Sequence, residues 1–453
     1  MTVRPTASSF PRRSLSPRLA LTSLVLAGLC GQIQAQGPGP DARFDLLEGI
    51  PDRSYPELAP PPVRTPVESP LLVVRAGRLL PIDGPPIERG MLICEDGVIT
   101  AVGKELDVPE GARVLDYPDS VIVPGFVELH CHVGVTGGDI NDMVIGHNMD
   151  LRTLDLVTQD SPELAQAVRA GVTSALIIPG SGSTIGGLGT FVKTWGPTFE
   201  QRLLRYPGAL KIALHARGGN PSRRSGDLGS MRLGLHYMLK VTMQDARRYH
   251  DEFVAFESGD GEKPAFNPRL DPLRGLWRQE FPVLLHAYGQ NDTMTSIRIL
   301  LWGLRAPIVI SHGVYDSFKI ADVLAQTGVP MNIGPRQFEF DEGVFVGNAA
   351  ELDRAGVPTS ICTDAPVVDQ DQLFVQAAMA VRLGMPWEHA MIGLTLEPAR
   401  AIGFADRLGS LTVGKDADFA VYPGDPLDPR NAPQLVVVDG MIAVDRRRDP
   451  RDG

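Results

Sequence analysis

The chain has 453 residues, a hydrophobic fraction of 43% and a formal net charge of −11. This length exceeds one small domain and fits one large domain with an additional smaller part. Because nucleic acids and anionic membranes select basic surfaces, the negative charge argues against both as partners. The sequence does not indicate an oligomeric state.

The N-terminus has the pattern of an export signal. Four arginines precede an apolar core at residues 19–30, and "IQAQ" offers a small-residue cleavage site after Ala35. We therefore expect residues 1–35 to be a signal peptide and the mature protein to be periplasmic, exported by the Sec or the twin-arginine route. Cleavage removes the four arginines and changes the formal net charge from −11 to −15. No membrane span is expected after cleavage, because no later apolar run is long enough.

The parts that follow the signal differ in composition. Residues 36–70 are proline-rich, with "GPGP" and "APPPVRTP", and are predicted to be a linker or an extended arm. Residues 71–124 and 401–453 share short alternating strands with glycine-containing turns. Each of these two parts is too small for a good core of its own. We therefore predict one small composite β-sandwich domain, built from both ends of the mature chain.

Residues 125–400 alternate apolar strands with amphipathic helical stretches. Eight strands in βα alternation fit an α/β fold, the (β/α)₈ TIM-like barrel, in which catalytic groups lie at the C-terminal ends of strands. A doubly wound sheet is the alternative, but no glycine-rich dinucleotide fingerprint follows the first strand. The segment "PGSGSTIGGLG" is predicted to be a loop that shapes the pocket, and residues 134–154 a lid or substrate loop.

Histidines and acids gather at the predicted strand ends. In "PGFVELHCHVG", Glu128, His130 and His132 alternate and therefore share one face of a strand. For the histidine pair alone, two buried imidazoles hydrogen-bonded to neighbours would be an adequate explanation. Six polar groups converging on one barrel mouth would be costly without a partner, however, and a metal ion gives them one. The six strand-end residues are His130, His132, Lys211, His286, His312 and Asp364.

These stretches make the chain resemble the amidohydrolase superfamily of metal-dependent hydrolases. The resemblance covers roughly residues 71–444 and rests on "PGFVELHCH", "LLHAYG", "VISHG", "CTDAP" and the tail "EPARAIGFADRLGSLTVGKDADF". Within the superfamily, "HAYGQNDTMTSIRILLWGLRAPIVISHG" is most similar to the imidazolonepropionase-like and prolidase-like branch. Members usually have Asp where this chain has Glu128, a departure that affects contacts around the ligands more than metal binding.

The resemblance implies a metal centre and a mechanism. The centre would hold divalent metal, two Zn²⁺ per chain, and would supply a metal-bound hydroxide as the nucleophile. Asp364 would accept a proton from the metal-bound water and pass it to the leaving group, acting first as general base and then as general acid. The implied metal ligands are His130, His132, His286, His312 and Asp364.

The bridge between two ions is expected to be a lysine. In related binuclear enzymes, the strand-four lysine of an "IKI"-like run is carboxylated, and its carbamate oxygens bridge the metals. The run "ALKIALHARGG" is similar, so Lys211 is the expected bridge. A buried salt-bridged Lys211, or Lys193 in "FVKTW" as the bridge, are the alternatives. Tyr288 and Arg336 follow the fifth and seventh strands and are predicted to reach substrate, although structural roles would also explain them.

Three functions remain open from the sequence. The first is an exported hydrolase that cleaves an amide-type C–N bond in a small-molecule substrate, namely a dipeptide, an N-acyl amino acid or a cyclic amide. The second is a mononuclear aminohydrolase that deaminates a heterocycle. That branch usually has His-x-x-Glu on strand five, whereas here Gly289 and Gln290 stand where an acid would be needed. The third is a non-catalytic binding relative, although such chains typically lose ligands and this one retains them all.

Overall fold

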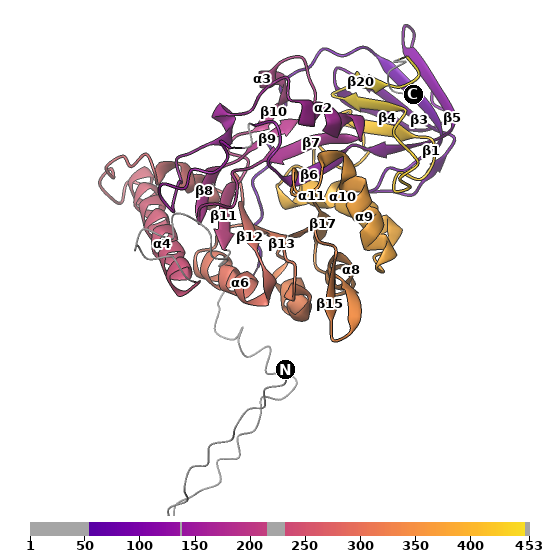
Figure 1. Ribbon diagram of the computed structural model, residues 1–453. Coiled ribbons are helices and arrows are strands. Elements are labelled where there is room, and N and C mark those ends of the chain that lie inside the picture. The colour runs from indigo at the N-terminus through magenta and orange to yellow at the C-terminus, as the bar shows by residue number, and fades with distance from the viewer. Residues whose placement is uncertain (1–53, 136–137, 215–231, 449–453) are drawn as a thin grey trace, which may run out of the picture. The chain divides into compact units, whose positions relative to one another are not determined.

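The computed structural model describes residues 54–135, 138–214 and 232–448, all within the compact unit Asp52–Gly453 (Figure 1). The predicted signal peptide, residues 1–35, and residues 36–53 of the predicted linker lie outside the described residues. Within the described ranges, no helix has the length and apolar character needed to cross a membrane.

Strands from both ends of the described chain lie in one eight-stranded sheet, indigo and yellow in Figure 1. Its strands are β1 (Leu72–Leu79), β2 (Ile87–Glu88), β3 (Gly90–Glu95), β4 (Val98–Lys104), β5 (Arg113–Pro124), β18 (Phe419–Tyr422), β19 (Leu435–Val438) and β20 (Met441–Asp445). The order is β20-β19-β18-β5-β1-β3-β4, with β2 paired to β1. β5 and β18 are antiparallel, with Pro124 opposite Phe419. One sheet thus combines the two chain ends, whereas a sandwich of two sheets stays a prediction.

The α/β part contains two further sheets. Their strands are β6 (Phe126–Cys131), β7 (Val172–Ile177), β8 (Ile185–Leu188), β9 (Thr190–Lys193), β10 (Leu203–Arg205), β11 (Leu210–Leu214), β12 (Val283–Ala287), β13 (Ile308–His312), β14 (Met331–Ile333) and β17 (Thr359–Ile361). The orders are β10-β9-β7-β6 and β17-β14-β13-β12-β11-β8. β6 is parallel to β7, and β11, β12, β13, β14 and β17 are parallel to one another. Only Gly189 separates β8 from β9, and a bridge between Cys131 and Ala365 links β6 to the residues after β17.

The third predicted strand does not run parallel to its neighbours. β9 is antiparallel to β7, and β8 is antiparallel to β11. The reason is the connection: residues 178–184 form the glycine-rich loop and contain no helix. A parallel return needs a crossover of about a dozen residues or more, whereas a short loop brings the chain back antiparallel. The expectation of eight parallel strands is therefore wrong at this strand.

Helices follow most of the parallel strands, as Figure 1 shows for α6, α8 and α9. In α2, Ser161 Oγ accepts a hydrogen bond from the Leu164 amide, Pro162 occupies the first turn, and Leu164, Ala167 and Val168 are buried. The helices are α2 (Pro162–Arg169), α3 (Phe199–Arg202), α4 (Arg232–Glu257), α5 (Arg274–Trp277), α6 (Gly289–Ser296), α7 (Ala321–Thr327), α8 (Asn348–Arg354), α9 (Leu373–Arg382), α10 (Trp387–Leu394) and α11 (Leu396–Ala401). Shorter elements are η1 (Thr153–Asp155), η3 (Asp271–Leu273), η4 (Ile297–Gly303), η5 (Ser317–Ile320), η6 (Gln370–Gln372) and the hairpin β15 (Phe338–Asp341) and β16 (Val344–Gly347).

Residues 54–70, which we call the arm, contain no helix or strand but are held against the body of the protein. The buried Tyr55 hydroxyl donates to the Ile308 carbonyl at 2.8 Å, and the Ala59 amide donates to the Gln279 carbonyl at 2.8 Å. Further along, Arg64 Nη1 donates to the Asp96 carbonyl at 2.9 Å. The arm therefore contacts both the α/β part and the eight-stranded sheet.

Candidate metal centre

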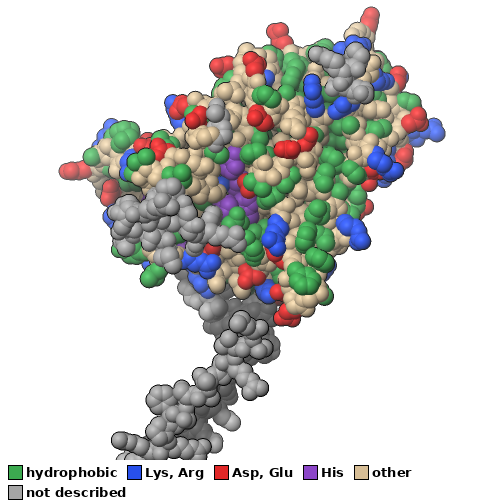
Figure 2. Space-filling model, in the orientation of Figure 1, with side chains coloured by type: hydrophobic (Ala, Val, Ile, Leu, Met, Phe, Trp, Pro, Cys, Tyr) green, Lys and Arg blue, Asp and Glu red, His purple; other side chains and the backbone are tan. Residues whose placement is uncertain are grey.

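Five predicted ligands come from the C-terminal ends of four strands. His130 lies in β6 and His132 directly after it, His286 lies in β12, His312 ends β13, and Asp364 follows β17. Their possible ligand atoms fall into two groups, each within 4.8 Å: His130 with His286 and His312, and His130 with His132 and Asp364. Figure 2 shows histidine side chains, in purple, gathered in a hollow of the surface. His130 belongs to both groups, so the two potential sites adjoin.

Backbone carbonyls fix how two of these imidazoles are oriented. His132 Nδ1 lies 2.9 Å from the Ile178 carbonyl, and His312 Nδ1 lies 2.6 Å from the Gly334 carbonyl. Because a carbonyl can only accept, each Nδ1 carries the hydrogen and each Nε2 keeps a lone pair. Those Nε2 atoms lie 3.3 and 4.0 Å from Asp364 oxygens. This arrangement, with the second nitrogen tied to the protein, is typical of metal-ligating histidines.

The electrostatics of the centre suit a divalent cation. Burial lowers the pKa of His130 and His286 well below the usual value, and that of His312 to about 4, so all three are neutral at physiological pH. Burial alone would raise the pKa of Asp364, but His130 and His132 beside it lower that pKa below its usual range. The buried His312 Nε2 has no hydrogen-bond partner among the described residues. Neutral imidazoles with one carboxylate are ligands that zinc prefers, so the residues present fit the metal.

Glu128 joins the first and last strands of the centre. It is fully buried, and its Oε1 accepts from the His130 amide at 2.9 Å. Its Oε2 accepts from the Thr363 amide at 2.9 Å and the Thr363 hydroxyl at 2.7 Å, and from Gln370 Nε2 at 3.1 Å. Glu128 therefore positions the loop that carries Asp364, in keeping with the expected contact role around the ligands.

The backbone is strained at two ligand positions. His312 has φ of 75° and Asp364 has φ of 55°, both in the left-handed region that non-glycine residues rarely adopt. Each follows or ends a short buried strand, where the surrounding hydrogen bonds hold the conformation. Strain of this kind clusters at functional sites.

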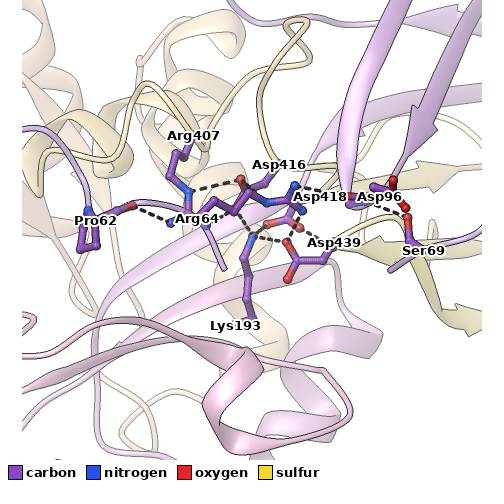
Figure 3. A network of polar contacts seen from close by, with 10 residues as sticks. Pro62, Arg64, Ser69, Asp96, Lys193, Arg407, Asp416, Asp418 and Asp439 are labelled. Carbon is purple, nitrogen blue, oxygen red and sulfur yellow. Dashed lines mark hydrogen bonds and ion pairs between the residues drawn. The ribbon is translucent and has the colours of Figure 1, made fainter. Parts of the chain in front are cut away.

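The structure separates the two lysines considered as a bridge. Lys211, in β11, is fully buried, and its Nζ lies 3.0 Å from His130 Nε2. Burial lowers the pKa of Lys211 to about 7, and the nearby Asp364 offsets only part of that effect. Lys193 instead contacts Asp416 at 2.9 Å and also Asp418 (Figure 3). Lys211 is thus the lysine that reaches the centre.

Tyr288 lies at the centre, and Arg336 lies farther out. The Tyr288 ring is 4.5 Å from the His286 ring and 5.5 Å from the Tyr315 ring, centroid to centroid. Arg336 is half exposed, pairs with Glu339 at 2.7 Å and covers the Tyr315 ring at 5.4 Å. Arg336 therefore supports Tyr315 in this structure, and a direct substrate contact stays a prediction.

A cavity of about 300 Å³ adjoins the centre and is lined in part by Tyr288, Gln290 and Tyr315. Sequence reasoning did not single out Tyr315, although it lies only three positions after His312. Nor did it single out Ser181, whose Oγ lies 3.0 Å from His286 Nδ1 and which belongs to the glycine-rich loop. That loop also binds the predicted lid, since the Gly182 amide donates to Asn141 Oδ1 at 2.7 Å.

Comparison with known proteins agrees with this geometry. The profile of the amidohydrolase family matches residues 284–443. Amidohydrolase tasK of Hapsidospora irregularis is 26% identical over 79% of this chain, which spans only 40% of that relative. An imidazolonepropionase of Mesorhizobium japonicum is 24% identical over 74% of this chain and 87% of its own length.

Solved structures extend the likeness. An amidohydrolase from Thermotoga maritima MSB8 has a TM-score of 0.75 and 28% identity, covering 82% of this chain and 99% of that one. A prolidase complexed with N-methylphosphonate-L-proline has a TM-score of 0.53 at 17% identity, covering 82% of this chain and 99% of that one, and shares the fold. The profile over residues 284–443, the relatives and the shared fold together make the chain similar to the amidohydrolase superfamily of metal-dependent hydrolases, including relatives named imidazolonepropionase.

Proposed function

We propose that this protein is an exported, binuclear metal-dependent hydrolase that cleaves an amide-type C–N bond in a dipeptide, an N-acyl amino acid or a cyclic amide. The observation that carries the proposal is the pair of adjoining ligand groups that share His130. Similarity to proteins named amidohydrolase and imidazolonepropionase supports the hydrolase class.

Two sets of residues would hold the ions. His132 and Asp364 would hold one ion and His286 and His312 the other, and His130, whose single free ring nitrogen can bind only one ion, would complete one of the two sets. Divalent ions held there, for which we propose Zn²⁺, would polarise the scissile carbonyl and lower the pKa of the attacking water. Tyr288, in edge contact with His286, forms part of the wall against which the substrate would lie.

Asp364 is proposed to move the proton. Its carboxylate is 13% exposed and lies between the imidazoles of His130 and His132, with 3.3 Å from its Oδ1 to each Nε2. It can accept a proton from the attacking water and return it to the leaving nitrogen, which departs as a neutral amine. Glu128 holds the loop of Asp364, so the carboxylate keeps its place during both transfers.

Lys211 is proposed to bridge the two sets as a carbamate. Its amine would add to CO₂, forming an N–C bond and releasing one proton, which leaves one negative charge over two oxygens. The complete burial of Lys211, its 3.0 Å approach to His130 and its lack of an ion pair with a carboxylate among the described residues support this role.

We also infer that the α/β strands close into the barrel of the family, with one strand reversed. The pairings that run from β6 through β7, β9, β8 and β11 to β17, together with the bridge between Cys131 and Ala365, support closure. A closed barrel explains why ligands from strands far apart in sequence meet at one mouth.

The test combines metal analysis with a substrate screen. Purified protein should contain close to two divalent ions per chain, hydrolyse members of at least one of the three amide classes and lose that activity on chelation. Full activity in metal-free protein would overturn the proposal. One ion per chain, with ammonia released from a heterocycle, would favour the mononuclear aminohydrolase instead.

Export is proposed from the sequence of residues 1–35, with the mature N-terminus at Gln36. Mass spectrometry of periplasmic material should find a chain that begins there. An intact Met1 would contradict the proposal.

A further inference from the structure

A second cavity, of about 390 Å³, lies between the arm and the strand β10. The arm contributes residues 62–65 and Val67, and β10 with the residue after it contributes Leu203, Leu204, Arg205 and Tyr206. The wall carries three arginines and one acid, which are Arg64, Arg205, Arg407 and Asp439. The cavity therefore has a positive lining in a protein whose net charge is negative.

Two of the three arginines are already neutralised. Arg64 lies 3.3 Å from Asp416 and 3.4 Å from Asp439, and Arg407 lies 2.8 Å from Asp416 (Figure 3). Together with Lys193 and Asp418 they form a buried network of three positive and three negative groups, which we call the ionic network. The network is balanced, so it does not account for the remaining arginine.

Arg205 has no acidic partner among the described residues. Only 6% of the residue is exposed, and Nη2 donates to the Gly208 carbonyl at 3.0 Å. Nε and Nη1 have no hydrogen-bond partner in the part of the chain that the structure describes. Burial lowers the pKa of Arg205 to about 9, which still leaves it charged at neutral pH. A buried charge without a partner is costly, so this position calls for an explanation.

The orientation of Arg205 leaves one side suited to an anion. The Phe404 ring covers one face of the guanidinium, with its centroid 5.0 Å from Cζ, and the N–H groups lie in the guanidinium plane. Guanidinium N–H donors bind carboxylate or phosphate oxygens, and Arg205 keeps two of them free on different edges of the group, Nε–H on one and Nη1 on the other.

We propose that this cavity binds a small oxyanion, a phosphate or carboxylate group, through the guanidinium of Arg205. The anion would neutralise the uncompensated charge and accept a hydrogen bond from one of the two free donors, Nε or Nη1. Both atoms are covered from bulk solvent, so binding requires a small movement of side chains in the wall. The site is separate from the metal centre, since none of the residues that line it is a predicted ligand.

The test compares the wild type with Arg205→Met, using inorganic phosphate and acetate at constant ionic strength with chloride as the reference. Thermal melting and calorimetric titration report binding. Phosphate or acetate should raise the melting temperature of the wild type by a few degrees, and the one with the larger effect identifies the favoured anion. Loss of the charged donors should weaken binding by roughly tenfold to a hundredfold in Arg205→Met. Without anion, Arg205→Met should melt at least as high as the wild type, because it removes an unpaired buried charge.

Two controls keep the result interpretable. Arg152→Met removes an arginine that covers Tyr206 from outside, at 6.0 Å from its ring, and should leave anion binding unchanged. Arg205→Lys keeps the charge without the planar guanidinium and its fixed donors, and should bind with intermediate affinity. Any anion signal that persists in Arg205→Met belongs elsewhere, such as the metal centre. Equal stabilisation of wild type and Arg205→Met, or no effect of either anion on the wild type, would overturn the proposal.

Discussion

Two lysines of this protein, Lys193 and Lys211, are fully buried, and their pKa values are shifted in opposite directions. Around Lys193, Asp416, Asp418 and Asp439 lie within 3.4 Å, and their charges outweigh the effect of burial and raise its pKa. Around Lys211 lie neutral imidazoles, so burial dominates and lowers its pKa to about 7. Burial alone does not decide the charge of a lysine; the partners that the fold brings to it do.

The same difference distinguishes a lysine with a structural role from one that is available for chemistry. A lysine that is charged and fully paired holds elements together, here β9 and the segments before β18 and after β19. A lysine with little electrostatic compensation is available for reaction or metal binding. The predictions below test this division, first at the metal centre and then at the ionic network.

The largest effect is expected from a carboxylate that interacts with each lysine, Asp364 with Lys211 and Asp416 with Lys193. Asp364→Asn should keep much of the metal but reduce kcat by about 10²-fold or more, because the amide cannot accept the proton. Asp416→Asn, the matched change beside Lys193, should lower stability and leave kcat of the folded enzyme nearly unchanged. Steady-state kinetics with metal analysis check both variants, and an unchanged kcat in Asp364→Asn would remove it from the mechanism.

Lys211→Ala should lower the metal content by about one ion per chain and turnover by roughly 100-fold, because two cations about 3.5–4 Å apart lose a bridging anion. Acetate or propionate should fill the space and partly restore both quantities. Lys193→Ala, assayed in parallel, should show no rescue by carboxylates. If Lys211→Ala binds two ions and turns over normally, the bridge assignment is wrong.

The free energy of unfolding should depend more strongly on Lys193 than on Lys211. Lys193→Met leaves three buried carboxylates facing only Arg64 and Arg407, and should lower the free energy of unfolding by about 3–5 kcal/mol. Lys211→Met removes no ion pair and should lower the free energy of unfolding by clearly less than Lys193→Met does. Urea denaturation of both variants in metal-free buffer measures the two losses, and equal losses would break the distinction between the lysines.

The smallest expected effect is the pH dependence of stability that arises from Asp418. Burial raises the pKa of Asp418 from 3.8 to about 6, while Lys193 and Arg407 help to hold that of Asp416 at about 2 despite its burial. Proton binding by Asp418 therefore stabilises the fold fully below pH 3.8, and this contribution is lost as pH rises through 6. Asp418→Asn lacks the titration, so the stability of the wild type relative to this variant should fall between pH 4 and 7. The expected change is on the order of 1–3 kcal/mol, and a constant difference across that range would contradict it.

Local patterns in the sequence were enough to predict where the histidines and Asp364 lie. Each stands at the end of a short apolar strand, and strand ends of one sheet meet at one edge, so their convergence could be inferred. The reversal of β8 and β9 could have been foreseen from the shortness of the loop before them, but the apolar runs alone carry no direction. Strand direction is set by the connection, not by the strand.

Contacts between residues that are far apart in the sequence could not be predicted in the same way. The partners of Lys193 lie 223 and 225 positions away, so nothing near "FVKTW" indicates them. Glu128 was placed correctly on the ligand face, yet its bonds to Thr363 depend on the packing of the first strand beside the last. Arg205 belongs to no motif, and only the three-dimensional surroundings reveal that its charge lacks a partner.

The pairing of β5 with β18 has a consequence for synthesis. Ribosomes complete β5 long before they reach β18, so the edge of β5 that receives Ala420 and Val421 stays unpaired while most of the chain is translated. The histidine-bearing strand β6 begins two residues after β5, so its start lies directly beside the seam that β18 completes. A nascent chain that stops before β18 would therefore expose this edge and its apolar residues to chaperones and proteases.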